Sequence, residues 1–150
     1  MGHAYLGHLR GNAGGWAHSR LGWLEVYADR PHLALPRFEQ AIRLSPLDPM
    51  NFNNYVGIAS AHQLNEDYAQ AADFFQRAII ERPTAYWIHR NLAPVLLAAG
   101  RYADAEQSKA ILFAEFPDLT IERYKQAMVF SPAALERISV YLRQLGMAEA

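Results

Sequence analysis

The side chains best suited to metal binding in this sequence are its six histidines, at positions 3, 8, 18, 32, 62 and 89. A helix presents two histidines to one metal ion when they are one turn apart, and no His-x3-His pair occurs. His62 and His89 fall at core-facing positions of predicted helices, which indicates that they pack in the interior. We therefore predict no metal site.

Nucleophilic and phosphate-binding chemistry also lacks its usual spacing. The chain has no cysteine, and the acidic pairs Glu66-Asp67 and Asp104/Glu106 have no base or nucleophile placed beside them. Gly14-Gly15 is not followed by the Lys-Ser/Thr of a phosphate-binding loop. We predict a protein that is not an enzyme and that needs no cofactor.

Composition narrows the class of protein further. The 150 residues are 51% hydrophobic, enough for one domain with a real core, and the formal net charge of −1 offers no general attraction to nucleic acid. The N-terminus lacks the apolar run of a signal peptide, and no segment is apolar enough to span a membrane. We expect a cytoplasmic protein without membrane or nucleic-acid partners.

The elements that organise the chain are two short helices predicted within residues 52–83. Apolar and small residues recur at helical spacing in both, and Pro83 ends the second helix because it cannot continue the backbone hydrogen bonding. A single hairpin of this size cannot bury its own apolar face. The residues that form that face are Tyr55, Ile58, Ala59 and His62, then Tyr68, Ala71, Phe75, Ala78 and Ile79.

The same pattern occurs twice more, as Leu21-Gly22, Ala34, Phe38, Ala41 and Pro46 upstream and as Leu92-Ala93, Gly100, Tyr102, Ala105 and Pro117 downstream. The closing prolines are 34 residues apart between the last two copies and 37 between the first two. A period of about 34 with small residues at these offsets is typical of the tetratricopeptide repeat (TPR). We predict an all-α solenoid of three repeats, at residues 16–48, 52–85 and 86–119, coiled as a right-handed superhelix.

The two ends of the chain depart from the period. Residues 1–15 contain a turn-like Arg10-Gly11-Asn12 and no second helix, so they are either an incomplete repeat or a flexible tail. Residues 120–150 predict two capping helices, with Thr120 and Ser131 as N-caps. Prolines inside the predicted helices, Pro36 and Pro94, predict a delayed start or a bend.

TPR solenoids bind peptides on a concave surface lined by the first helix of each repeat. All three tryptophans fall on this predicted groove, and exposed aromatic residues mark binding surfaces. The alternative is that the N-terminal segment or the C-terminal helix covers them. The predicted groove residues are Trp16, Ser19, Trp23, Val26 and Tyr27 from the first repeat, Asn53, Val56, Ser60 and Gln63 from the second, and Trp87, Arg90, Asn91 and Leu97 from the third.

Three stretches resemble a particular group of TPR regions. Leu21-Gly22-Trp23 with the segment RLSPLDP at residues 43–49, the segment HRNLA at 89–93, and the tail LERISVYLRQLG at 135–146 look like the C-terminal TPR region of bacterial class III adenylate/guanylate cyclases and of related winged-helix regulators. The resemblance covers residues 16–147 and implies a regulatory or interaction module. It implies no cyclase activity, because no cyclase domain is present; the chain is then either a fragment or a free-standing relative.

These observations leave three hypotheses for function. The first is a non-catalytic module that binds a protein or peptide in an aromatic-lined groove, where Asn53, Gln63, Arg90 and Asn91 orient the ligand. The second is a module that forms a homodimer through its groove or its N-terminal segment. The third is a regulatory piece of an adenylate cyclase-like protein. TPR domains that clamp a C-terminal carboxylate carry Lys and Asn where this chain has Ser19 and Trp23, so we expect no such clamp.

Overall fold

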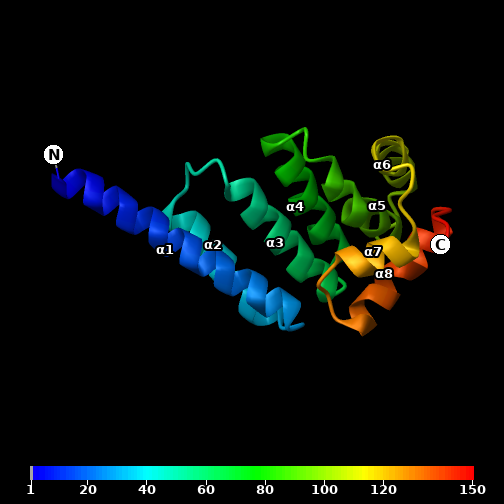
Figure 1. Ribbon diagram of the computed structural model, residues 1–150, viewed down its shortest axis with the longest axis horizontal. Coiled ribbons are helices and arrows are strands. Elements are labelled where there is room, and N and C mark those ends of the chain that lie inside the picture. The colour runs from blue at the N-terminus through cyan, green and yellow to red at the C-terminus, as the bar shows by residue number, and fades with distance from the viewer. Residues whose placement is uncertain (1) are drawn as a thin grey trace.

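The computed structural model describes residues 2–150, with side chains from Gly14 onward, and the described residues form only helices (Figure 1). This confirms the predicted all-α repeat fold. The elements are α1 (Gly2–Tyr27), α2 (Pro31–Leu44), α3 (Asn51–Leu64), α4 (Tyr68–Glu81), the 3-10 turn η1 (Tyr86–Ile88), α5 (His89–Ala98), α6 (Tyr102–Glu115), α7 (Ile121–Ala127) and α8 (Pro132–Gln144).

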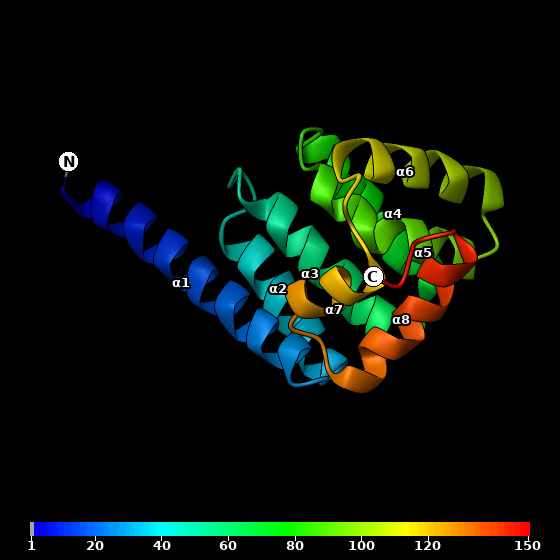
Figure 2. The ribbon, with the colours of Figure 1, turned by 45° about the vertical axis from the view of Figure 1, so that its right-hand side comes forward.

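Successive helices pair as antiparallel hairpins, and each hairpin stacks on the next (Figure 2). The small and aromatic residues at repeat-equivalent positions of α2 and α4 are completely or almost completely buried: Ala34, Phe38 and Ala41, then Ala71, Phe75 and Ala78. The third hairpin has Lys109 in place of the aromatic residue, and its ammonium group lies 5.9 Å from the ring of Phe113. The buried side chains of all three hairpins belong to one cluster, so the core is continuous.

Phe38 joins the first two hairpins. Its ring lies against the backbones of Gly22 in α1 and Gly57 in α3, where an added Cβ would come within 2.8 Å and 2.3 Å of ring atoms. Neither position has room for a methyl group, since side-chain carbons pack about 3.5–4.0 Å apart. Glycine at these two places lets one aromatic ring lie between two helices.

The turn inside each hairpin uses a left-handed residue. Asp29, Glu66 and Gly100 have φ values of 58°, 62° and 80° at equivalent places after α1, α3 and α5. Only Gly100 adopts this conformation without a steric cost from Cβ. All three turns are held alike, because the backbone amides of Asp29, Glu66 and Gly100 each donate a hydrogen bond of 3.0 Å to a carbonyl of the preceding helix.

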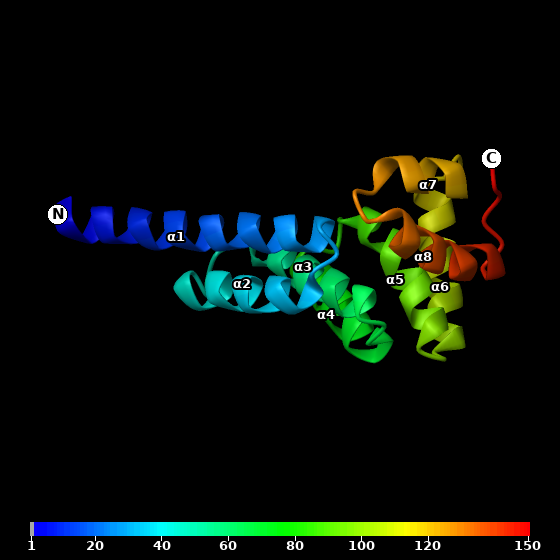
Figure 3. The ribbon, with the colours of Figure 1, turned by 90° about the horizontal axis from the view of Figure 1, so that it is seen from below.

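The N-terminal expectation of a turn at Arg10-Gly11-Asn12 is wrong, because α1 is continuous from Gly2 to Tyr27. Glycine lowers helix stability by only about 1 kcal/mol per residue relative to alanine, so a run of glycines does not by itself end a helix. Figures 1 and 3 show α1 extending well past the end of α2. The side chains of residues 1–13 lie outside the described part of the structure. The expectation of an incomplete repeat depends partly on these side chains and to that extent lies outside it too.

The two prolines inside predicted helices have different surroundings. Pro36 lies within α2, which nevertheless begins at Pro31, so the expected delay of the helix start does not occur. Pro94 lies within α5 and is buried. The third hairpin begins with the 3-10 turn η1, and α5 has only 10 residues.

The C-terminal helices α7 and α8 return across the solenoid and lie beside α5 (Figures 1 and 3). Thr120 Oγ1 accepts a hydrogen bond from the backbone amide of Arg123, and Ser131 Oγ accepts one from Ala134, which confirms both predicted N-caps. The buried side chains of α7 and α8 join the same core cluster as Val56 of α3 and Leu92 of α5. These helices therefore cover part of the surface that the first helices of the repeats present.

Candidate functional site

The predicted groove is closed along its middle. Val56, Ser60 and Gln63 of α3 and Asn91 of α5 are all buried, as is Val26 of α1. Ser60 Oγ donates to the carbonyl of Val56 at 2.8 Å instead of facing a ligand. In this conformation these side chains have little exposed surface, so a partner could contact them only after a rearrangement.

Tyr124 of α7 shows how the C-terminal helices close the groove. Its hydroxyl donates to Oδ1 of Asn91 at 2.6 Å, and burial raises the pKa of this phenol far above its ordinary value. Arg90 is half-buried beside it and donates from Nε to the carbonyl of Trp87 at 3.1 Å. Desolvation lowers the pKa of Arg90, which is partly offset by the neighbouring phenol. Asn91 and Arg90 are thus engaged within the chain.

Polar contacts hold α8 along the turns of the solenoid. Ser131 donates to a carboxylate oxygen of Asp29 at 3.1 Å, at the turn between α1 and α2. Further along α8, Arg137 forms an ion pair with Glu66 at 3.6 Å, at the turn between α3 and α4. The helix therefore spans two successive hairpin turns, which follows from its apolar face packing on the core between them.

An open cavity remains at the end of the concave surface nearest the N-terminus. It has a volume of about 230 Å³ and lies between α1, the end of α2 and the beginning of α3. Four residues of the predicted groove line it: Trp16, Ser19, Trp23 and Asn53. We call this cavity, with its lining residues Gly15, Trp16, Ser19, Arg20, Trp23, Ala41, Ser45, Asp48, Met50, Asn51, Asn53 and Asn54, the α1–α3 pocket.

The aromatic residues of the α1–α3 pocket differ in exposure. Trp16 is 63% exposed, and the guanidinium of Arg20 lies 4.7 Å from the centre of its ring. Trp23 is partly buried, with its ring centre 5.5 Å from that of Phe38 in an edge contact. Its indole Nε1 is buried and has no hydrogen-bond partner. Trp16 can therefore provide contact area, whereas the indole N–H of Trp23 is covered in this structure.

A row of asparagine amides crosses the α3 side of the pocket. Asn51 Nδ2 donates to the carbonyl of Ser45 at 2.8 Å, and Asn54 Nδ2 donates to Asn51 Oδ1 at 3.0 Å. Asn54 Oδ1 is buried and has no partner. The prediction from the sequence missed Asn54 and Arg20, although three asparagines within residues 51–54 are a visible cluster of amides.

The remaining predicted groove residues lie apart from this pocket. Trp87 is partly buried in η1, with its ring centre 6.5 Å from that of Phe52. Tyr27 is 40% exposed beside Trp23, and burial raises the pKa of its phenol. The three tryptophans therefore do not form one surface. Trp16 and Trp23 share a pocket that does not include Trp87.

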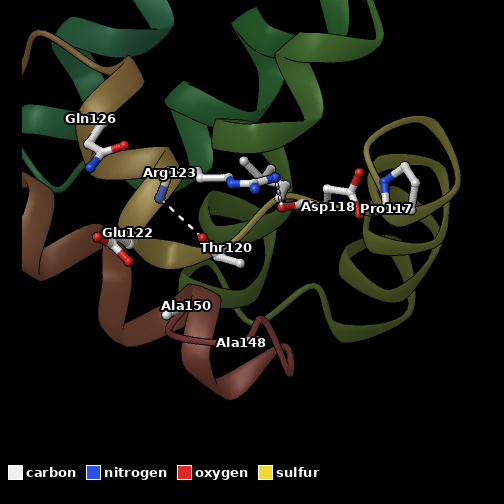
Figure 4. A pocket seen from close by; sticks show the side chains of 9 residues that line it. Pro117, Asp118, Thr120, Glu122, Arg123, Gln126, Ala148 and Ala150 are labelled. Atoms are coloured by element: carbon white, nitrogen blue, oxygen red, sulfur yellow. Dashed lines mark hydrogen bonds between the residues drawn. The ribbon is translucent and has the colours of Figure 1, made fainter.

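A second hollow, of about 510 Å³, lies beside α7 and the C-terminal tail (Figure 4). Several of its polar groups are bonded within the chain: Arg123 donates from its guanidinium to the carbonyl of Asp118 at 2.9 Å and from its backbone to Thr120 Oγ1 at 3.2 Å. The carbonyls of Ala148 and Glu149 accept from the amides of Ile121 and Glu122. This hollow is a packed helix start, and we assign it no ligand.

His89, which is buried, and His62, which is partly buried, pack against neighbouring side chains. His89 Nδ1 lies 2.7 Å from Ser108 Oγ, and burial lowers the pKa of the imidazole. His62 stacks on Phe74, with ring centres 5.7 Å apart. Burial lowers the pKa of His62, and the nearby carboxylates of Asp67 and Glu39 partly offset this by raising it.

Within the described part of the chain, no three His, Cys, Asp or Glu residues lie together as metal ligands do. No helix of that part is long and apolar enough to cross a membrane.

Comparison with known proteins agrees with the repeat architecture. Two family models described as tetratricopeptide repeat match, one over residues 19–86 and the other over residues 63–128. Superkiller protein 3 of Schizosaccharomyces pombe is 32% identical over 87 residues, which are 58% of this chain and 6% of that protein. The chain thus spans a small fraction of the length of this curated relative. With three stacked helical hairpins of the predicted period, residues 19–128 consist of tetratricopeptide repeats, and the chain is a tetratricopeptide repeat protein.

Proposed function

We propose that this protein binds a peptide segment of another protein in the α1–α3 pocket. TPR repeats generally mediate protein–protein interaction and are typically non-catalytic. The observation that carries the proposal is that two predicted groove residues of this pocket, Trp16 and Asn53, keep exposed surface, whereas Val56, Ser60 and Gln63 of α3 and Asn91 of α5 are buried.

The pocket combines the features that peptide sites use. An exposed tryptophan with a guanidinium over its ring offers contact area, and a few convergent polar groups give direction. Met50, which is 53% exposed, extends the apolar surface at the rim. A bound segment would lie across α1 and the start of α3, beyond the region that the C-terminal helices occupy.

The experiment selects binders from a random peptide library on the immobilised full chain and measures their affinity by calorimetry. We expect Trp16→Ala to weaken binding roughly tenfold or more, as loss of an aromatic anchor commonly does. Tyr102→Ala is the matched control, because Tyr102 is 67% exposed and lies on α6, outside the pocket. Peptides that bind wild type and Trp16→Ala equally would show that the binding surface lies elsewhere.

The other two hypotheses for function, self-association and a regulatory role beside a cyclase domain, have less support from the structure. Self-association through α1 draws support from its length beyond α2, and full-chain mass by light scattering over a concentration series tests it. If the protein is a dimer and Trp16→Ala converts it to a monomer, the result would favour self-association through the α1–α3 pocket. A regulatory role beside a cyclase domain rests on the sequence resemblance alone.

A further inference from the structure

We propose that α1 pairs in antiparallel orientation with α1 of a second copy of this chain, so that the protein is a homodimer. The contact surface is the side of α1 opposite the core, which we call the outer face of α1 and define by Ala17, Leu21 and Leu24. None of these three residues lines the α1–α3 pocket. The inference therefore concerns assembly, and it holds or fails independently of peptide binding.

The outer face of α1 is apolar and exposed in the single chain. Leu21 is 40% exposed, Leu24 is 58% exposed, and Ala17, one turn earlier, is also exposed. Spacings of four and three residues place these side chains on one side of the helix. Gly22 and Val26 of the same helix are buried in the core. The helix α1 therefore has apolar residues on two sides, and only one of these sides packs on the rest of the chain.

The equivalent face of α3 is a packing surface. The first two repeats are offset by 37 residues, so Leu21 and Leu24 of α1 correspond to Ile58 and Ala61 of α3. Ile58 is 4% exposed and Ala61 is 0% exposed, because α3 packs on the helices of the first hairpin. Among the described residues, no hairpin covers α1 in this way. The outer face of α1 is thus the kind of surface on which another helix stacks in this fold.

The order of the apolar residues along α1 favours a second copy of α1 as that helix. One row of apolar positions runs along the helix sequence at spacings of 3, 4, 4, 4 and 3 residues: Leu6, Leu9, Ala13, Ala17, Leu21 and Leu24. These five steps cover 18 residues, which matches the 3.6 residues per turn of an α-helix and keeps the row on one side.

This row of spacings is the same in both directions along the chain. In an antiparallel pair centred on position 15, the first three positions lie opposite the last three of the partner in reverse order. Leucine then meets leucine toward both ends, and alanine meets alanine at the centre, where small side chains let two helices approach closely. A twofold interface requires a self-complementary surface, and this row provides one.

The length of α1 fits the same register. The helix begins at Gly2, whereas α2 ends at Leu44, next to Gly14, so residues 2–13 extend past α2 (Figures 1 and 3). A helical segment of this length is marginal in water by itself, and Gly7 and Gly11 weaken it further. In the proposed pair, residues 3–13 of each copy lie along residues 17–27 of the other. Each extension is then covered by the outer face of the partner's α1.

The first test measures the mass of the full chain by light scattering over a concentration series. We expect wild type to have twice the chain mass of 16.9 kDa and Leu24→Glu to have the single-chain mass, because the substitution places two carboxylates in the apolar contact. Leu47→Glu is the matched control, since Leu47 is 94% exposed and lies outside α1. Trp16→Ala should leave the dimer intact, which separates this contact from the α1–α3 pocket. A monomeric wild type, or a dimer that Leu24→Glu leaves unchanged, overturns the inference.

The second test reports the orientation and register, and it does not depend on how Leu24→Glu folds. The chain has no cysteine, so Leu6→Cys and Leu24→Cys each carry one thiol. After subunit exchange and oxidation with glutathione disulfide, a mixture of the two variants should form covalent dimers, because positions 6 and 24 lie opposite each other. Neither variant alone should do so, since two copies of one position are roughly 27 Å apart along an antiparallel pair, well beyond the reach of a disulfide. Cross-linking of either variant with itself, or none in the mixture, overturns the inference.

Discussion

The hydroxyl of Tyr124 donates a hydrogen bond of 2.6 Å to Oδ1 of Asn91, which joins α7 to the first helix of the third hairpin. Both side chains are buried, so this bond lies in the interior, where a stranded polar group is costly. Asn91 was predicted to contact a ligand in the groove. In this structure its side chain is instead bonded to the chain's own C-terminal segment.

Removing this bond should lower stability. We expect Tyr124→Phe to reduce the free energy of unfolding by about 1–3 kcal/mol, since it leaves the Asn91 carbonyl oxygen buried without a donor. Urea denaturation measures the change, with Tyr102→Phe as the exposed control. In a double-mutant cycle, Asn91→Leu and Tyr124→Phe should be non-additive; additive losses would show that the two side chains are not coupled.

The contact of Gly57 with Phe38 makes a sharp packing prediction. Gly57→Ala should destabilise the protein by about 1–3 kcal/mol, because its methyl group would lie 2.3 Å from the ring of Phe38. Gly14→Ala is the matched control: its Cβ would lie 3.5 Å from Leu44, an ordinary contact, and alanine favours a helix. Thermal unfolding of both variants tests the contrast, and equal melting temperatures would contradict it.

The pH dependence of stability should reflect buried His89 and partly buried His62. Burial lowers the pKa of His89 and His62 from the ordinary value of 6.5, so below that value the unfolded chain binds protons that the folded chain resists. We expect stability to fall as the pH decreases from about 7.5 to about 5. Replacing His89 by glutamine should flatten this dependence in urea titrations at several pH values. An unchanged slope would assign the effect to other groups.

Ser131, at the start of α8, makes two hydrogen bonds: it accepts one from Ala134 as the N-cap and donates one to Asp29. Ser131→Ala should cost about 1 kcal/mol for the lost N-cap, together with any contribution from the bond to Asp29. Asp29→Asn keeps the cap and changes only the carboxylate partner, so it should cost less. Chemical denaturation of both variants separates the two effects. A loss in Asp29→Asn as large as that in Ser131→Ala would mean that the bond to Asp29, not the cap, stabilises this end of α8.

The sequence determined the repeat architecture because its signal is local and repeated. Small residues and prolines at a period of about 34 specify helical hairpins that must stack, whichever residues occupy the surface. Thr120 and Ser131 could be identified as N-caps for the same reason, since a cap depends on the chain within a few residues of it. The long α1 was missed because glycines weaken a helix without ending it.

Tertiary structure alone decided which part of the groove is accessible. Position within a repeat predicts that Val56, Ser60, Gln63 and Asn91 face the concave side, but their exposure depends on which other elements fold against them. The free donor of Trp23 and the free acceptor of Asn54 likewise come from different helices. Which polar groups remain unpaired depends on contacts between elements, and spacing along one helix does not contain that information.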